Sequence, residues 1–327
     1  MPIPKEALIK AILPAVGFLN RFRLGFPQYY FHGAGGIGDD LMATTIFREL
    51  RRRDSGRIAF ATQHPGLFEQ NPDVDRIIWH QHPRLRRWLR EGLPLQRLGY
   101  AHYDQVTDRD EPLDEHVLKK LCRHAGIEGP IELRPYVYLT PAEMAGGRLA
   151  DNQITIQSSA RGAAFAIQNK EWFPERFQEV CTELGNSHTL VQIGSQSDPP
   201  MAGALDCRGK TSLRESAALL ANSQVFLGLE GFLMHLARSV DCRSVIIYGG
   251  RLSPWQIGYS ANANLVGATP CSPCWLRNHC DYGHECMNMI STSIVLAAVR
   301  QQLERHGQPL EIESATLGRK SEPHSEA

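Results

Sequence analysis

From residue 27 onward, short apolar runs alternate with longer segments whose apolar residues recur at helical spacing. In the first part of the chain, apolar runs predict strands at residues 29–32, 57–62, 74–80 and 103–108. Helical spacing covers residues 40–53 and 114–127. This order of strand and helix predicts a parallel sheet covered by helices.

The same alternation starts again after a connector at residues 132–152, which carries Pro135, Pro141 and the pair Gly146-Gly147. Strands are predicted at residues 153–157, 189–194, 224–228 and 244–250, and helices at 174–185, 212–223, 231–240 and 291–307. Two successive alternations predict an α/β protein with two Rossmann-like domains that face a cleft. Ligands of such sheets bind at the carboxyl ends of the strands.

The pattern divides the chain into four parts. We expect an N-terminal helix or extension at 1–26, a first Rossmann-like domain at 27–145, a second at 146–305, and a disordered tail at 306–327, which has no apolar period. The apolar stretch before residue 24 contains Pro14 and is too short for a membrane span. Whether it packs on the body or touches a membrane surface stays open, because its basic face is weak.

Composition is that of a globular enzyme. The chain has 327 residues, of which 42% are hydrophobic, and Lys+Arg and Asp+Glu are both 35. This balance gives no reason to expect a nucleic-acid partner. We see no secretory signal, so a cytoplasmic location is expected, with the inner face of the cytoplasmic membrane as the alternative.

A glycine loop follows the first strand. Gly33, Gly35 and Gly38 fit the spacing of a dinucleotide-binding loop, but Asp39 and Asp40 come next, at the start of a helix. Carboxylates there repel a pyrophosphate, and the second strand ends in "FATQHP", without the acid that would hold a ribose. The loop therefore favours a positioned carboxylate, which is either a general base or a helix cap.

Four segments together resemble glycosyltransferase family 9, which includes the lipopolysaccharide heptosyltransferases. They are "GGIGDDLMATTIFRELRRR", "NKEWFPERFQEVCTEL", "GKTSLRESAALLANSQVFLGLEGFLMHLA" and "CSPCWLRNHC" with "CMNMISTSIV". The resemblance spans about residues 29–300. It implies a GT-B fold and an inverting, metal-independent transfer from a nucleotide-sugar, ADP-heptose by analogy, to a glycan or glycolipid acceptor.

The resemblance also implies roles for residues. Asp39 matches the catalytic base, and Lys170 matches a lysine that stabilises the leaving diphosphate. Glu230, Gly231, Phe232 and His235 stand where the family has Asp-Ser-Gly-x-x-His, so the donor motif is altered here. A buried core histidine is the alternative for His235. Further donor-binding candidates, at the ends of predicted strands, are Ser158, Ser159, Arg161, Gly194 and Ser195.

On the acceptor side, Gly35, Gly36 and Gly38 would allow a sugar to approach the backbone closely. The Arg-rich segment 83–97 supplies Arg84 and Arg87, which would attract an acidic or phosphorylated acceptor. A solvated helix face is the alternative reading of these arginines.

Four cysteines, Cys271, Cys274, Cys280 and Cys286, lie in the segment 270–287. Their spacing indicates a structural zinc or iron site, free thiols or disulfides, and a closed four-thiolate site would not be catalytic. No cofactor is expected for the transfer itself.

Two other functions remain open at this stage. A nucleotide-sugar epimerase of the same fold would need no acceptor groove. A non-catalytic protein of this fold would explain the altered motif around Glu230.

Overall fold

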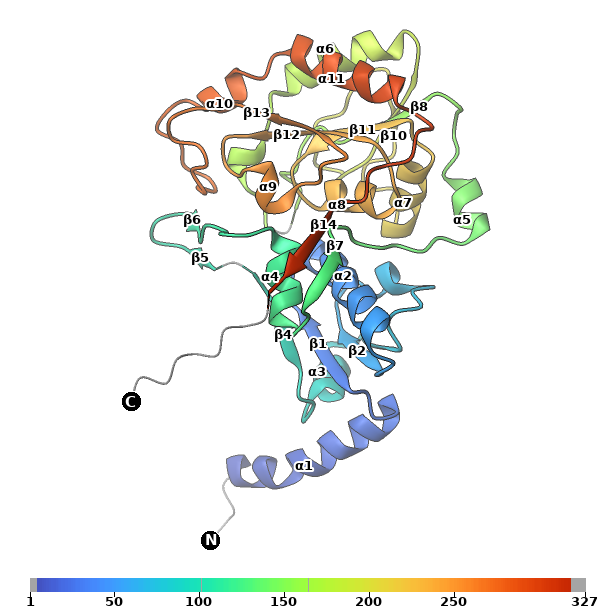
Figure 1. The fold of residues 1–327 in the computed structure, drawn as a ribbon, viewed down its shortest axis with the longest axis vertical. Helices are drawn as coiled ribbons and strands as arrows, with labels where there is room; N and C mark the ends of the chain where they lie inside the picture. Colours follow the sequence, from blue (N-terminus) through green and yellow to red (C-terminus); the bar gives the residue numbers. More distant parts are fainter. Residues whose placement is uncertain (1–4, 101, 164, 319–327) are drawn as a thin grey trace.

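The computed structural model describes residues 5–100, 102–163 and 165–318, and Figure 1 shows two α/β halves, one above the other. The lower half is built on a four-stranded parallel sheet in the order β3-β2-β1-β4. β2 is buried at every position, as expected of an apolar run inside a covered parallel sheet. The elements of this half are β1 (Tyr29–Gly33), α2 (Ile37–Arg53), β2 (Ile58–Ala61), the 3-10 turn η1 (Pro65–Phe68), β3 (Arg76–Ile78), α3 (Pro83–Arg90), β4 (Gln96–Leu98) and α4 (Val117–His124).

The upper half is built on a six-stranded parallel sheet in the order β10-β9-β8-β11-β12-β13. Its strands are β8 (Gln153–Ile156), β9 (Thr189–Gln192), β10 (Leu205–Asp206), β11 (Val225–Leu229), β12 (Ser244–Gly249) and β13 (Ala263–Val266). Its helices are η2 (Gln168–Lys170), α6 (Pro174–Gly185), α7 (Leu213–Ala221), α8 (Phe232–Ser239), α9 (Pro254–Ile257), α10 (Glu285–Asn288) and α11 (Thr292–Glu304). The predicted α/β class with two parallel sheets is confirmed.

Strand order fixes where ligands can bind. In the lower sheet, β2 and β3 lie on one side of β1, and β4 lies on the other side. In the upper sheet, β9 and β10 lie on one side of β8, and β11 lies on the other side. The loops that follow these strands diverge at such a point and leave a crevice at their carboxyl ends.

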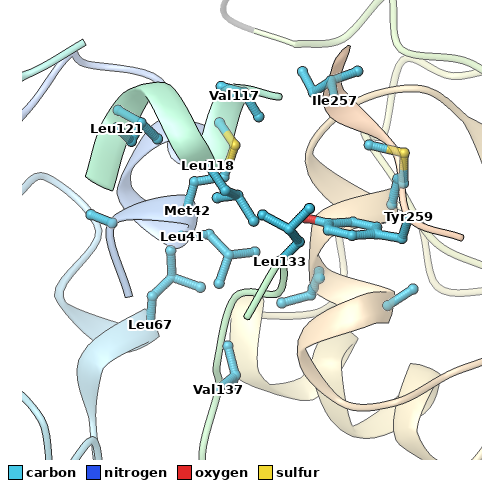
Figure 2. Packing of buried hydrophobic residues seen from close by; sticks show 14 of the residues in the cluster. Leu41, Met42, Leu67, Val117, Leu118, Leu121, Leu133, Val137, Ile257 and Tyr259 are labelled. Carbon is cyan, nitrogen blue, oxygen red and sulfur yellow. The ribbon is translucent and has the colours of Figure 1, made fainter. Parts of the chain in front are cut away.

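One apolar core runs through both halves. Leu41 and Met42 of α2 and Leu118 of α4 belong to the same buried cluster as Ile257 and Tyr259 of the upper half, and Figure 2 shows these side chains converging. A shared core of this kind holds the two halves in one arrangement, because separating them would expose apolar surface to water.

The end of the chain corrects one prediction. Residues 306–327 were expected to be disordered, but β14 (Ser314–Leu317) pairs antiparallel with β7 (Gly129–Glu132). Leu317 is buried in the core of the first half, which gives the tail a reason to order. Residues 319–327 lie outside the described residues.

The strand predicted at 103–108 is also wrong. These residues form a tight hairpin, in which β5 (Tyr103–Asp104) pairs with β6 (Arg109–Asp110). Asp104 accepts hydrogen bonds from the Val106 N–H and the Thr107 hydroxyl, and such side-chain bonds turn the chain instead of extending it. The predicted connector contains a short capped helix, α5 (Pro141–Gly146).

The first helix, α1 (Lys5–Leu24), continues through Pro14 and packs beside α3. Of the helices in the described ranges, none combines the length and the apolar character that a membrane crossing requires.

Candidate active site

Asp39 stands at the crevice of the lower sheet. β1 ends at Gly33 and α2 begins at Ile37, so the glycine loop turns the chain within three residues. Gly35 has a φ of 118°, which L side chains rarely adopt. The Gly36 N–H donates to Asp39 Oδ2 over 3.2 Å, so the carboxylate does cap the helix. The capping and catalytic readings of Asp39 are therefore compatible.

The surroundings of Asp39 favour a proton acceptor. Burial raises the pKa of its carboxyl, and the neighbouring Asp40 raises it further. The Gly36 N–H, the Tyr100 hydroxyl and the Arg97 charge act in the opposite direction, but the pKa stays above its usual range. A carboxylate with a raised pKa is a stronger base than an ordinary one.

Asp40 has a different role. It is buried, and its Oδ2 accepts from Thr62 Oγ1 at 2.5 Å and lies 2.8 Å from His64 Nδ1. A Cβ at Gly33 would collide with its Oδ1. Asp40 therefore joins the glycine loop to the end of β2, and of the two aspartates only Asp39 keeps some exposure.

The start of α8 lies directly across from this loop. A Cβ built on Gly38 would be 3.9 Å from both Phe232 Cα and His235 Cδ2. Gly231, the residue before the helix, has a φ of 149°, and a free helix start offers N–H donors to an anion. Two segments predicted from opposite halves of the sequence, the glycine loop that precedes Asp39 and the start of α8, are thus brought together at Gly38.

Lys170 and Glu230 form a buried ion pair. Lys170 Nζ is 2.6 Å from Glu230 Oε2, and Arg251 Nη1 is 3.9 Å from the same oxygen. Burial alone would raise the pKa of Glu230, but Lys170 and Arg251 hold it below its usual value. Two cationic side chains, Lys170 and Arg251, therefore lie beside Glu230 at the ends of β11 and β12, next to the start of α8.

Arg251 also links the two halves. Its guanidinium contacts Asp110 of the β5–β6 hairpin, and Arg277 contacts the other Asp110 oxygen with Nη2 at 2.6 Å. The guanidinium of Arg277 lies 3.8 Å from the centre of the Tyr103 ring. We call Asp110, Arg251 and Arg277 the interdomain clasp.

The predicted donor-binding serines point into the protein. Ser158 Oγ donates to the Pro199 carbonyl over 3.0 Å, and Ser159 Oγ donates to Glu171 Oε2 over 2.7 Å. Arg161 keeps an exposed side chain near Glu171. The loop that contains these residues packs against Ser195, since a Cβ at Gly162 would overlap it. Gly194 adopts a φ of 132°, which turns the chain after β9.

His235 fits the reading as a core histidine. It is buried, its Nδ1 is 2.6 Å from the Tyr259 hydroxyl, and burial lowers its pKa to about 3. A neutral imidazole beside Gly38 shapes the crevice but adds no charge to it.

A basic cavity of about 450 Å³ opens beside the glycine loop. It is lined by His32, Pro83, Arg86, Arg87, Arg90, Glu91 and Leu95. Burial lowers the pKa of His32, and Arg90 and Arg97 lower it further, although its contact with the Gly33 carbonyl acts in the opposite direction. Arg87 of the predicted acceptor residues lines this cavity, whereas Arg84 is an exposed residue of α3 outside its lining.

The cysteine segment supports the Lys170 turn. Asn169 donates from its side chain to the carbonyls of Leu276 and His279, and His284 Nε2 lies 3.0 Å from its carboxamide oxygen. The segment also meets the β5–β6 hairpin through an Arg109–Leu276 bridge. The residues around Lys170 are thereby tied to the lower half.

The thiols themselves are free in this structure. Cys274 and Cys286 each lie within electrostatic range of other cysteines of the segment. Within residues 5–100, 102–163 and 165–318, no three His, Cys, Asp or Glu side chains are grouped as a metal site would require. The side-chain positions thus do not form a metal site, and the structural zinc or iron stays a prediction that the metal content of purified protein tests.

Three residues near Asp39 and Lys170 were missed by sequence reasoning. Tyr100 follows β4, a strand hidden in the Arg-rich segment, so its place at a strand end was not recognised. Arg251 follows a strand that was predicted, and the rule of strand ends could have found it. His32 precedes the glycine loop, and only the fold brings Arg86 and Arg90 to it.

Comparisons with known proteins concern the family and the fold. Residues 143–283 match the sequence model of glycosyltransferase family 9 (heptosyltransferase). This match covers most of the upper half, without α10 and α11, and does not reach the Asp39 loop. No curated protein matches the sequence.

Solved structures of the same architecture cover more of the chain. The glycosyl transferase family 9 protein of Veillonella parvula is 14% identical over 85% of this chain and 97% of its own, with a TM-score of 0.62. The ADP-heptose lps heptosyltransferase II of E. coli is 15% identical over 85% and 98%, with a TM-score of 0.63. The iron-containing dodecameric glycosyltransferase TibC of enterotoxigenic E. coli is 19% identical over 85% and 77%, with a TM-score of 0.65. At these identities the likeness establishes the fold. The protein therefore has a GT-B fold, and its residues 143–283 match the sequence model of glycosyltransferase family 9 (heptosyltransferase).

Proposed function

We propose that the protein is an inverting glycosyltransferase that moves a sugar from a nucleoside diphosphate to a hydroxyl of a glycan or glycolipid. The observation that carries this proposal is that the Asp39 loop lies against the start of α8. A Cβ built on Gly38 of the loop would lie 3.9 Å from Phe232 Cα of the helix. A base from one half and an anion-binding helix start from the other are what a direct displacement requires.

In the proposed reaction, Asp39 takes the proton of the acceptor hydroxyl while that oxygen bonds to the anomeric carbon. The bond from this carbon to the diphosphate oxygen breaks, and the electron pair leaves with the nucleoside diphosphate. Attack from the face opposite the leaving group inverts the anomeric centre. The raised pKa of Asp39 supports its part as proton acceptor.

The leaving diphosphate would be stabilised at the end of β11. Lys170, Arg251 and the N–H groups at the start of α8 all lie at this end. Lys170 is paired with Glu230 here, so a bound diphosphate would share the lysine with that carboxylate. Positive charge arranged in advance lowers the barrier because it needs no rearrangement as the diphosphate forms.

The proposed donor and acceptor rest on different observations. ADP-heptose is the proposed donor, because the E. coli protein of the same fold is an ADP-heptose lps heptosyltransferase and TibC was solved in complex with ADP-D-β-D-heptose. The basic cavity at His32, Arg86 and Arg90 supports an acceptor that carries phosphate or carboxylate groups close to the attacking hydroxyl.

A transfer assay tests the proposal. Purified protein is incubated with ADP-heptose or another nucleotide-sugar and with phosphorylated glycan acceptors, and nucleoside diphosphate release and glycan mass are measured. Asp39→Asn should lower kcat by about 10²–10⁴-fold, the usual contribution of a general base. The control Asp151→Asn alters an aspartate whose side chain is 86% exposed, and it should leave the rate unchanged.

The outcomes also separate the alternatives. Interconversion of the donor sugar without transfer would show an epimerase and refute the proposal. Absence of turnover with any donor, in protein that still binds nucleotide, would favour a non-catalytic role. Transfer that continues at full rate in Asp39→Asn would remove Asp39 from the mechanism.

A further inference from the structure

The face of α1 that points away from the body is aromatic. Phe18 and Phe22 are each 64% exposed, Phe26 just beyond the helix is 51% exposed, and Leu19 is 47% exposed. The rings touch, with centroids 5.7 Å apart for Phe18 and Phe26 and 6.2 Å for Phe22 and Phe26. Single exposed apolar residues are ordinary, but a contiguous group of this kind marks a binding surface.

The opposite face of α1 is fixed to the body. Asn20 Nδ2 donates to the carbonyls of Trp88 and Glu91, at 2.9 and 3.1 Å. Gly17 packs so closely on Gly92 that a Cβ at either position would lie 2.5 Å from the other residue. The helix therefore cannot roll to bury its aromatic face without losing these contacts, and Figure 1 shows α1 at the end of the molecule beyond the sheet.

The end of the molecule that carries this face is basic. Residues 13–26 and 83–92, which pack on each other, contain the arginines Arg21, Arg23, Arg84, Arg86, Arg87 and Arg90 and a single acid, Glu91. Six cations and one anion leave a net charge of about +5 on these two segments. The positive charge of α1 is weak by itself, but α3, which the fold packs beside it, adds four arginines to the same end of the molecule.

We infer that α1 docks on the surface of a bilayer that contains anionic lipids, with Phe18, Phe22 and Phe26 in the headgroup region. Aromatic side chains bordered by arginines are typical of helices that lie in this interface. A second copy of the chain is the less suitable occupant, because two surfaces of about +5 repel each other, whereas an anionic membrane attracts them. This inference does not rest on the proposed function.

Vesicle flotation of the full chain tests it. We expect the protein to bind vesicles of equal phosphatidylcholine and phosphatidylglycerol, and this binding should weaken as the salt concentration rises. Binding to phosphatidylcholine alone should be at least about tenfold weaker. The double variant Phe18→Ser/Phe22→Ser should weaken binding by at least about tenfold, because two apolar side chains no longer leave water. Both positions are exposed, so the thermal midpoint should not fall.

A matched control separates this site from general stickiness. Phe165, on the other half of the protein, is 65% exposed, and Phe165→Ser should bind vesicles like the parent. The double variant Arg84→Gln/Arg87→Gln should bind anionic vesicles less tightly than the parent, and its weak binding to neutral vesicles should be unchanged. Equal binding by the parent and the Phe18→Ser/Phe22→Ser variant would overturn the inference. So would absence of vesicle binding, or self-association of the parent that the same double variant abolishes.

Discussion

Asp110→Asn should destabilise the whole molecule, because it removes the one anion of the interdomain clasp. Asp110 is 6% exposed and accepts from both Arg251 and Arg277. After the substitution, Arg251 keeps only Glu230, 3.9 Å away and already paired with Lys170. Its Nε has no partner among the described residues even in the native protein. Asparagine keeps the shape of the side chain, so the substitution removes only the negative charge and its attraction to the two guanidinium groups.

The magnitude follows from burial. Removing one partner of a buried ion pair costs about 3–5 kcal/mol, because the other charge stays out of water. Arg277 is partly exposed and can recover water, so we expect the lower end, about 3 kcal/mol. With an unfolding entropy of roughly 2.1 cal/mol/K per residue over about 310 residues, this lowers Tm by about 5 °C.

Differential scanning calorimetry at neutral pH measures the shift. Asp114→Asn, an exposed aspartate four residues along, is the control and should change stability by less than about 0.5 kcal/mol. The double variant Asp110→Asn/Arg277→Gln should lose less than the sum of its single variants, since both break one contact. A Tm for Asp110→Asn equal to that of the control would refute the account of the clasp.

Three further outcomes follow from the site. Tyr100→Phe removes a hydrogen bond that lowers the pKa of Asp39, so the acid limb of kcat against pH should move to higher pH, whereas Tyr103→Phe should leave it in place. Asp39→Asn should raise Tm at neutral pH although it lowers kcat. The folded state raises the pKa of Asp39, so the ionised carboxylate costs stability as pH rises through that pKa, and an unchanged or lower Tm would contradict this. EDTA in the transfer assay should leave the initial rate unchanged, because Lys170, Arg251 and the start of α8 supply the positive charge, and a rate restored only by added Mg²⁺ would disprove that.

Much of the fold could be predicted because hydrophobic periodicity is a local signal. The helix predicted at 291–307 is observed as Thr292–Glu304, and the strand at 244–250 as Ser244–Gly249. Local signals failed where structure depends on distant pairing. β4 is three residues long and lies among arginines, and β14 orders only because β7 accepts it as a neighbour.

The candidate site divides in the same way. Asp39, Lys170 and Glu230 could be singled out because each stands beside a short motif. The fold pairs Lys170 with Glu230, and the charges of both Asp39 and Glu230 raise the pKa of Tyr100. Ser158 and Ser159 also follow the end of a predicted strand, yet their hydroxyl groups donate hydrogen bonds to other groups of the protein. A sequence position fixes which strand end a side chain occupies, but packing decides whether it points into the crevice.

The sequence by itself determined two parallel α/β halves, a carboxylate after the first strand and a lysine before α6. Only the tertiary structure decided that the loop before Asp39 meets the start of α8 at Gly38, while Asp40 is buried against Thr62 and His64. It also decided that α3 packs beside α1, so that the arginines of both helices lie at one end of the molecule. The physical reason is range: periodicity and capping act over a few residues, whereas burial and charge depend on which distant segments the core brings together.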